Sequence, residues 1–131
     1  MSAGVIVVTG ASAGIGRATA ERFLAEGWTV ALLARSADKL ATVAEGHERA
    51  LAVPCDVTDM ASIDATFETI RQSWGKLDFL VHAIAFSDKD ELTGRYVDTT
   101  PDNFTKTMFI SVYSFTAVAQ RAEKLMNDGG S

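Results

Sequence analysis

Cysteine is almost missing from this chain, since Cys55 is the only one. One thiol forms no internal disulfide, and it excludes a zinc site built from several cysteines, so we expect no metal. Because no histidine lies nearby in the sequence to activate the thiol, we expect Cys55 to be a small core residue rather than a nucleophile. The simplest compartment for such a chain is the cytoplasm.

Basic residues are also few, with 12 lysines and arginines against 17 aspartates and glutamates and a net charge of −5. Nucleic-acid binding needs a basic surface, so we expect no nucleic-acid partner. No apolar run approaches the length of a membrane span, and no basic segment followed by a long hydrophobic stretch opens the chain. We therefore expect no membrane partner either.

The chain does have enough length and apolar content for one core, with 131 residues of which 47% are hydrophobic. It shows no internal repeat, low-complexity tract or interdomain linker. These properties predict a single domain over residues 1–131.

The most informative stretch is residues 5–16, V-I-V-V-T-G-A-S-A-G-I-G. Its four β-branched residues predict a strand buried on both faces of a parallel sheet. A glycine turn then opens a helix, whose free N–H groups and positive dipole end form a natural site for a diphosphate. Gly10 would permit the sharp turn, Gly14 the close approach of a phosphate, and Gly16 close packing of helix on strand.

The rest of the chain alternates between strand and helix patterns. Further strands are expected at 29–34, 50–53 and 77–84, and helices at 15–26, 37–45, 59–74 and 101–126. Expected helix caps are Ser36, Thr58 or Asp59, and Thr100, while 86–99 is expected to be a surface loop. This order predicts an α/β fold: a Rossmann-type parallel sheet with strand order 3-2-1-4 and helices on both faces.

The form T-G-x-x-x-G-I-G between a strand and a helix resembles the cofactor fingerprint of the short-chain dehydrogenase/reductase family. Taken alone, a glycine-rich turn also fits a plain strand–helix connection. The resemblance implies that this turn binds a dinucleotide cofactor. The residues it would contribute are Gly10, Ser12, Ala13, Gly14, Ile15 and Gly16.

The end of the second strand bears on the choice of cofactor. An acidic residue there would bind the ribose 2′-OH of NAD, but this chain has Arg35 and Ser36. A guanidinium beside the ribose favours a 2′-phosphate, so we expect NADP(H) rather than NAD(H). The alternative is that Arg35 is simply a solvated arginine after a strand.

The segment C-D-V-T-D after the third strand resembles the family's adenine-side turn. The resemblance implies that Asp56 accepts from the adenine amino group and that Val57 lies beside the ring. Asp56 also fits the entry to the next helix, and the two roles are compatible.

The segment after the fourth strand departs from the main branch of the family, which carries N-N-A-G. The chain has H-A-I-A-F-S-D-K-D-E-L-T-G-R-Y-V-D-T-T followed by N-F-T-K-T-M-F-I-S-V-Y-S-F-T, similar to the enoyl-[acyl-carrier-protein] reductase branch. That similarity implies that Ile84 and Ala85 pass near the cofactor's ribose, while His82 fits a structural role. Because residues before 60 resemble the main branch, a chimera seam is expected within 60–73.

The family's chemistry uses a tyrosine with a lysine four residues later, or seven later in enoyl reductases. Tyr96 is followed by Thr100 and Asn103 at those offsets, and Tyr113 by Ala117 and Gln120. We therefore expect no catalytic residue here, and we expect the chain to end before the fifth strand and its Tyr/Lys segment.

Together these features predict the NADP(H)-binding half of a short-chain dehydrogenase/reductase that is inactive alone. A complete parent would transfer hydride to an enoyl thioester or a carbonyl. Alternatives are an engineered or recombined Rossmann chimera with a structural purpose, and a stand-alone nucleotide-binding module. We also expect a homodimer or larger homo-oligomer, since the edge of the 77–84 strand and the face of the 101–126 helix lack a partner.

Overall fold

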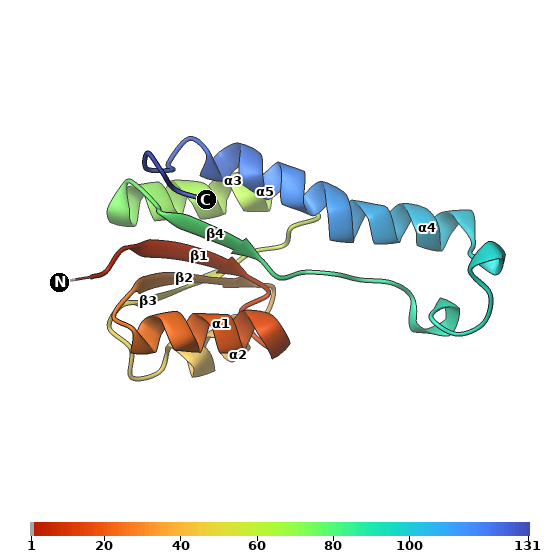
Figure 1. Cartoon of the computed structure of the whole chain (residues 1–131), viewed down its shortest axis with the longest axis horizontal. Helices are drawn as coiled ribbons and strands as arrows, with labels where there is room; N and C mark the ends of the chain where they lie inside the picture. The colour runs from red at the N-terminus through yellow and green to blue at the C-terminus, as the bar shows by residue number, and fades with distance from the viewer. Residues whose placement is uncertain (1) are drawn as a thin grey trace.

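The computed structural model describes residues 2–131, which form a four-stranded parallel sheet with helices on both faces (Figure 1). The strand order is β3-β2-β1-β4, as the sequence predicts. Val7 pairs with Ala31 of β2 on one side and with Leu80 of β4 on the other. The strands are β1 (Val5–Thr9), β2 (Thr29–Ala34), β3 (Ala50–Pro54) and β4 (Phe79–His82).

Alternate side chains of β1 point into two separate cores, because successive residues of a strand face opposite sides of the sheet. Ile6 and Val8 pack against α1 and α2, whereas Val5 and Val7 pack against α3 and α5. All four side chains are buried, which explains the uninterrupted apolar run of this strand. The main helices are α1 (Gly14–Ala25), α2 (Ala37–Ala44), α3 (Met60–Trp74), α4 (Pro101–Met108) and α5 (Ser114–Ala122).

The expected helix caps are present. The side chain of Ser36 accepts from the Lys39 N–H, and that of Thr100 accepts from the Asn103 N–H. At α3 the cap is Asp59 rather than Thr58. These caps are local interactions between residues two or three apart, which is why the sequence alone predicts them.

The predicted helix over 101–126 has a different internal structure from a regular α-helix. A π-helical segment, Phe109–Tyr113 (the π segment), separates α4 from α5, and α5 ends at Ala122. The apolar side chains of this region differ in burial: Phe104, Met108 and Phe115 are 48%, 42% and 54% exposed, whereas Val118 is fully buried. Figure 1 shows α4 extending beyond the sheet, which explains the exposure of Phe104 and Met108.

Strand β4 is shorter than the predicted 77–84, and its outer edge is partly paired. Leu77 forms an isolated parallel bridge with Met126, so residues that were predicted as helix bond to the sheet instead. Further along, the Leu80 N–H donates to the Ser131 carbonyl at 2.9 Å, and the Ser131 N–H donates to the Asp78 carbonyl at 3.0 Å. The expectation of a wholly unpaired edge is therefore wrong.

Some whole-chain properties bear on function. Within residues 2–131, no helix is long and apolar enough to cross a membrane. No group of three or more metal-ligating side chains is found in the same range. Cys55 is buried in the core, as expected, and this burial raises the pKa of its thiol.

Candidate functional site

The glycine turn after β1 lies where the carboxyl ends of the four strands meet. Gly10 has φ +63°, and a side chain there would meet the carbonyl oxygen of Ala83. A side chain at Gly16 would meet the carbonyl oxygen of Gly10, so this glycine allows α1 to pack closely on the turn. Gly14 has φ +55° with open space where a side chain would stand. The turn is thus tightly packed at Gly10 and Gly16, whereas the space beside Gly14 is open.

The N-terminus of α1 faces this open space with its backbone. Ala13 occupies the cap position, and no side chain within residues 2–131 caps this helix, in contrast to α2, α3 and α4. The first N–H groups of α1 and the positive end of its dipole therefore favour an anion at this position. Ala13 and Gly14 are exposed, and Ser12 is half-buried.

Ile15, in the first turn of α1, does not belong to the core. Its side chain is 80% exposed, whereas Ala20 and Leu24 of the same helix are buried. The first turn of α1 follows the carboxyl end of β1, where Ala13 and Gly14 are exposed as well. An exposed isoleucine beside the glycine turn provides apolar surface for a ligand.

Asp56 forms the turn between β3 and α3. Its Oδ1 accepts from the Thr58 N–H at 2.9 Å and from the Thr58 hydroxyl at 2.7 Å. These hydrogen bonds are the main cause of the lowered pKa of this carboxyl, and the positive charge of Arg35 lowers it further. Val57 is only 7% exposed and belongs to the core, so little of its side chain remains available to a ligand.

His82, the last residue of β4, makes hydrogen bonds at both ring nitrogens. Nδ1 lies 2.9 Å from the Thr9 hydroxyl, and Nε2 lies 2.8 Å from the Ser114 hydroxyl. The Thr9 hydroxyl also accepts from the Ala83 N–H at 3.0 Å. This geometry supports the structural role expected for His82. Sequence reasoning did not single out Thr9 and Ser114, because their partners are far away in the chain.

The structure places the predicted residues at the carboxyl ends of the four parallel strands. Ile84 packs against the turn, since a Cβ on Gly10 would lie 3.3 Å from Ile84 Cγ1. Ala85 is exposed beside it. Arg35 and Ser36 follow β2, and the Ser36 hydroxyl is occupied as the cap of α2. The candidate cofactor-binding residues thus extend from the end of β3 to the end of β4.

The side chains of both tyrosines are exposed. Tyr96 is 80% exposed in the short 3-10 helix Tyr96–Asp98. Tyr113 lies in the π segment and stacks on Phe109, with ring centroids 5.6 Å apart. Neither has the predicted lysine spacing.

The parallel sheet of order 3-2-1-4, with a glycine turn leading into an uncapped helix, defines a Rossmann-type domain of the short-chain dehydrogenase/reductase class. The sequence model of one family, described as enoyl-(acyl carrier protein) reductase, matches residues 10–131. The chain belongs to this family.

Similar proteins agree with this assignment. An enoyl-[acyl-carrier-protein] reductase [NADH] of Rhizobium meliloti is 73% identical over 77 residues, 59% of this chain and 28% of the relative. The enoyl-[acyl-carrier-protein] reductase [NADH] FabI of Bacillus cereus is 44% identical over 99 residues, 76% of this chain and 38% of the relative.

Solved structures extend the similarity to nearly the whole chain. The Anaplasma phagocytophilum enoyl-acyl-carrier-protein reductase in complex with NAD has a TM-score of 0.91 and 44% identity, covering 99% of this chain. The Brucella melitensis 3-ketoacyl-(acyl-carrier-protein) reductase complexed with NADH has a TM-score of 0.83 and 27% identity over 92% of this chain. The chain spans about half the length of these proteins, 52% and 48% respectively.

The predicted preference for NADP(H) is wrong. Similar reductases are named as NADH enzymes, and one solved relative holds NAD. The prediction treated Arg35 as an isolated cation beside the ribose. In the structure Arg35 is exposed after β2, which agrees with the alternative of a solvated arginine, and its charge makes only a minor contribution to the lowered pKa of Asp56. The predicted seam within 60–73 remains a prediction.

Proposed function

We propose that this chain forms the NAD(H)-binding part of an enoyl-[acyl-carrier-protein] reductase. The observation that carries the proposal is the open glycine turn, which places the uncapped N-terminus of α1 at the carboxyl edge of the sheet. The NADH-named relatives and the NAD complex support the choice of cofactor. When bound, NADH supplies the hydride for the reduction of an enoyl thioester.

The residues present fit a dinucleotide that extends along the sheet edge. The backbone from Gly10 to Gly16 would hold the diphosphate, because an open space above Gly14 faces free N–H groups. Asp56 would bind on the adenine side. Ile84 and Ala85 would lie against the nicotinamide-side ribose.

The chain itself would bind and orient the cofactor without completing the reaction. General acid catalysis in this family pairs a tyrosine with a lysine, and no tyrosine here has a lysine at either spacing. The activity of a complete reductase therefore requires residues beyond those of this chain.

The proposal can be tested by measuring NADH binding to the full chain and to two glycine variants. Gly14→Ala places a methyl group where the diphosphate would approach, and the positive φ adds strain of about 1–2 kcal/mol. Gly27→Ala is the matched control, because Gly27 also has a positive φ, +84°, and open space, but it lies beyond the far end of α1.

We expect similar losses of thermal stability for both variants, but a loss of NADH affinity of tenfold or more for Gly14→Ala alone. Calorimetric titration with NADH, with NADPH as a comparison, measures this. Equal affinity in Gly14→Ala and Gly27→Ala would refute the site, and stronger binding of NADPH would refute the cofactor assignment.

A further inference from the structure

The segment that follows β4, residues 83–88 (the strap), has no neighbouring strand. It runs from the end of β4 toward the 3-10 helix Lys89–Glu91, below α4 in Figure 1. Backbone N–H groups outside a sheet need other acceptors. Three side chains provide them: the N–H of Ala83 donates to Thr9 Oγ1 and that of Phe86 to Ser111 Oγ, while that of Asp88 donates to Asn103 Oδ1.

Ser111 holds both backbone groups of one strap residue. Its Oγ accepts from the Phe86 N–H at 2.9 Å and donates to the Phe86 carbonyl at 3.1 Å. A hydroxyl can do both at once because it is both donor and acceptor. The side chain thereby replaces the strand partner that Phe86 lacks.

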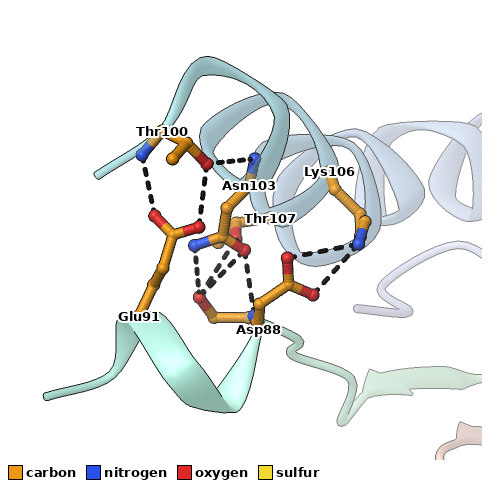
Figure 2. Close-up of polar contacts among 7 residues, drawn as sticks. Asp88, Glu91, Thr100, Asn103, Lys106 and Thr107 are labelled. Atoms are coloured by element: carbon orange, nitrogen blue, oxygen red, sulfur yellow. Dashed lines mark hydrogen bonds and ion pairs between the residues drawn. The ribbon is translucent and has the colours of Figure 1, made fainter. Parts of the chain in front are cut away.

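Asn103 fixes the far end of the strap. Its amide oxygen lies 2.9 Å from the Asp88 nitrogen, and its amide nitrogen lies 3.2 Å from the Ser87 hydroxyl. Figure 2 shows Asn103 against Asp88. Nearby, the Lys106 ammonium lies 3.0 Å from the Asp88 carboxylate. Asn103 is only 3% exposed, so this contact forms the interior of the junction.

The helical region from α4 to α5 runs antiparallel to the strap, so later residues of the helical region contact earlier residues of the strap. Asn103 contacts Asp88, Ser111 contacts Phe86, and Ser114 contacts His82, the residue before the strap. In a regular α-helix, residues 103 and 111 would differ in direction by about 80°. The π segment has a wider turn, which reduces this difference and turns Ser111 toward the strap.

The strap also contacts the glycine turn. The Ala83 carbonyl lies against Gly10, and Ile84 Cγ1 packs beside it. A displacement of the strap at Phe86 would therefore change the wall of the site on the β4 side, while the adenine side at β2 and β3 would keep its shape.

We propose that Ser111 is a positioning residue that sets the strap, and through it the nicotinamide side of the cofactor site. This inference rests on the proposed function. It assigns to Ser111 no contact with the reacting atoms. The effect of Ser111 on affinity is confined to ligands that extend beyond the diphosphate toward the nicotinamide side.

The test compares NADH with ADP, which carries the adenosine and diphosphate but no nicotinamide. Ser111→Ala removes both hydrogen bonds to Phe86, and we expect NADH affinity to fall about tenfold while ADP affinity changes less than about twofold. Ser111→Thr keeps a hydroxyl and should restore NADH affinity. Ser73→Ala is the control, because Ser73 donates only to Thr69 within α3.

The outcomes separate the inference from the proposed function. Unchanged NADH affinity in Ser111→Ala, or an equal loss of NADH and ADP affinity, would overturn the positioning role. If the unaltered chain binds neither ligand, the proposed function fails and the inference with it.

A second measurement covers the case in which Ser111→Ala does not fold. In the unaltered chain, hydrogen exchange at the Phe86 amide should be slowed by NADH and unaffected by ADP. Equal protection by both ligands would contradict the inference.

Discussion

The Nδ1 of His82 lies 2.9 Å from the hydroxyl of Thr9, a residue 73 positions earlier in the chain. The protons of this contact follow from the other partners. The Ser114 hydroxyl donates to the Ile110 carbonyl, so it accepts from His82 Nε2–H. Thr9 accepts from the Ala83 N–H and donates to Nδ1. The neutral imidazole of His82 thus connects β1, β4 and α5.

The first prediction concerns pH. Burial lowers the pKa of His82 below its usual value near 6.5, so the unfolded chain binds this proton more readily than the folded chain. The stabilisation that comes from keeping His82 neutral should therefore be fully present above about pH 6.5. Below that pH the free energy of unfolding should fall, by up to about 1.4 kcal/mol per pH unit.

Urea denaturation between about pH 5.5 and 7.5 measures this loss. His82→Gln should flatten the pH dependence, while His47→Gln should preserve it, since His47 is exposed before β3. A profile that is unchanged in His82→Gln would contradict the assignment.

The second prediction concerns the Thr9 hydroxyl, which is fully buried. Thr9→Val keeps the shape but leaves the Ala83 N–H without its acceptor and His82 Nδ1 without its donor. We expect a loss of about 2–4 kcal/mol in the free energy of unfolding. Thr66→Val is the control, because the buried Thr66 hydroxyl donates to the Ser62 carbonyl of its own helix. That variant should cost less than about 1 kcal/mol, and equal losses would contradict the prediction.

The third prediction is that the chain alone does not catalyse reduction. Tyr96 and Tyr113 lack a lysine at the family's spacing, so no pair is available to donate the proton. Absorbance at the NADH band, with an enoyl thioester as substrate, should decrease no faster than in a control without protein. Turnover that persists in the Tyr96→Phe and Tyr113→Phe variants would show that another group supplies the proton.

The fourth prediction is self-association through the face of α4 and the π segment. Phe104 and Val112 are 48% and 51% exposed, and burying such a side chain fully contributes about 1.5–3 kcal/mol. We expect a dimer or larger assembly by light scattering at micromolar concentration. Phe104→Glu combined with Val112→Glu should yield a monomer. The control is Val97→Glu, because Val97 is 69% exposed but lies outside this helix. A monomeric unaltered chain would refute the prediction.

Sequence reasoning succeeded where the determining interactions are local. The glycine spacing after β1 predicted a tight turn. Only glycine fits at position 10, beside the Ala83 carbonyl, and at position 16, beside the Gly10 carbonyl. Ser36, Asp59 and Thr100 cap their helices through bonds to residues two or three positions away. The alternation of strands and helices, with right-handed crossovers, then determined the order β3-β2-β1-β4.

Tertiary contacts decided the rest. The sequence pattern predicted one helix over 101–126. In the structure Ser111 contacts Phe86 from the π segment, which no local propensity specifies. Arg35 after β2 predicted a phosphate ligand, but similar reductases are NADH enzymes, so this one residue did not determine the cofactor. The roles of Thr9, His82 and Ser114 depend on partners more than 30 residues apart, and single-residue patterns do not encode such pairings. The sequence by itself determined the fold and the position of the glycine turn, because backbone geometry and burial follow local pattern. Only the packed structure determined how the walls of the site are held, because those hydrogen bonds form between segments that folding brings together.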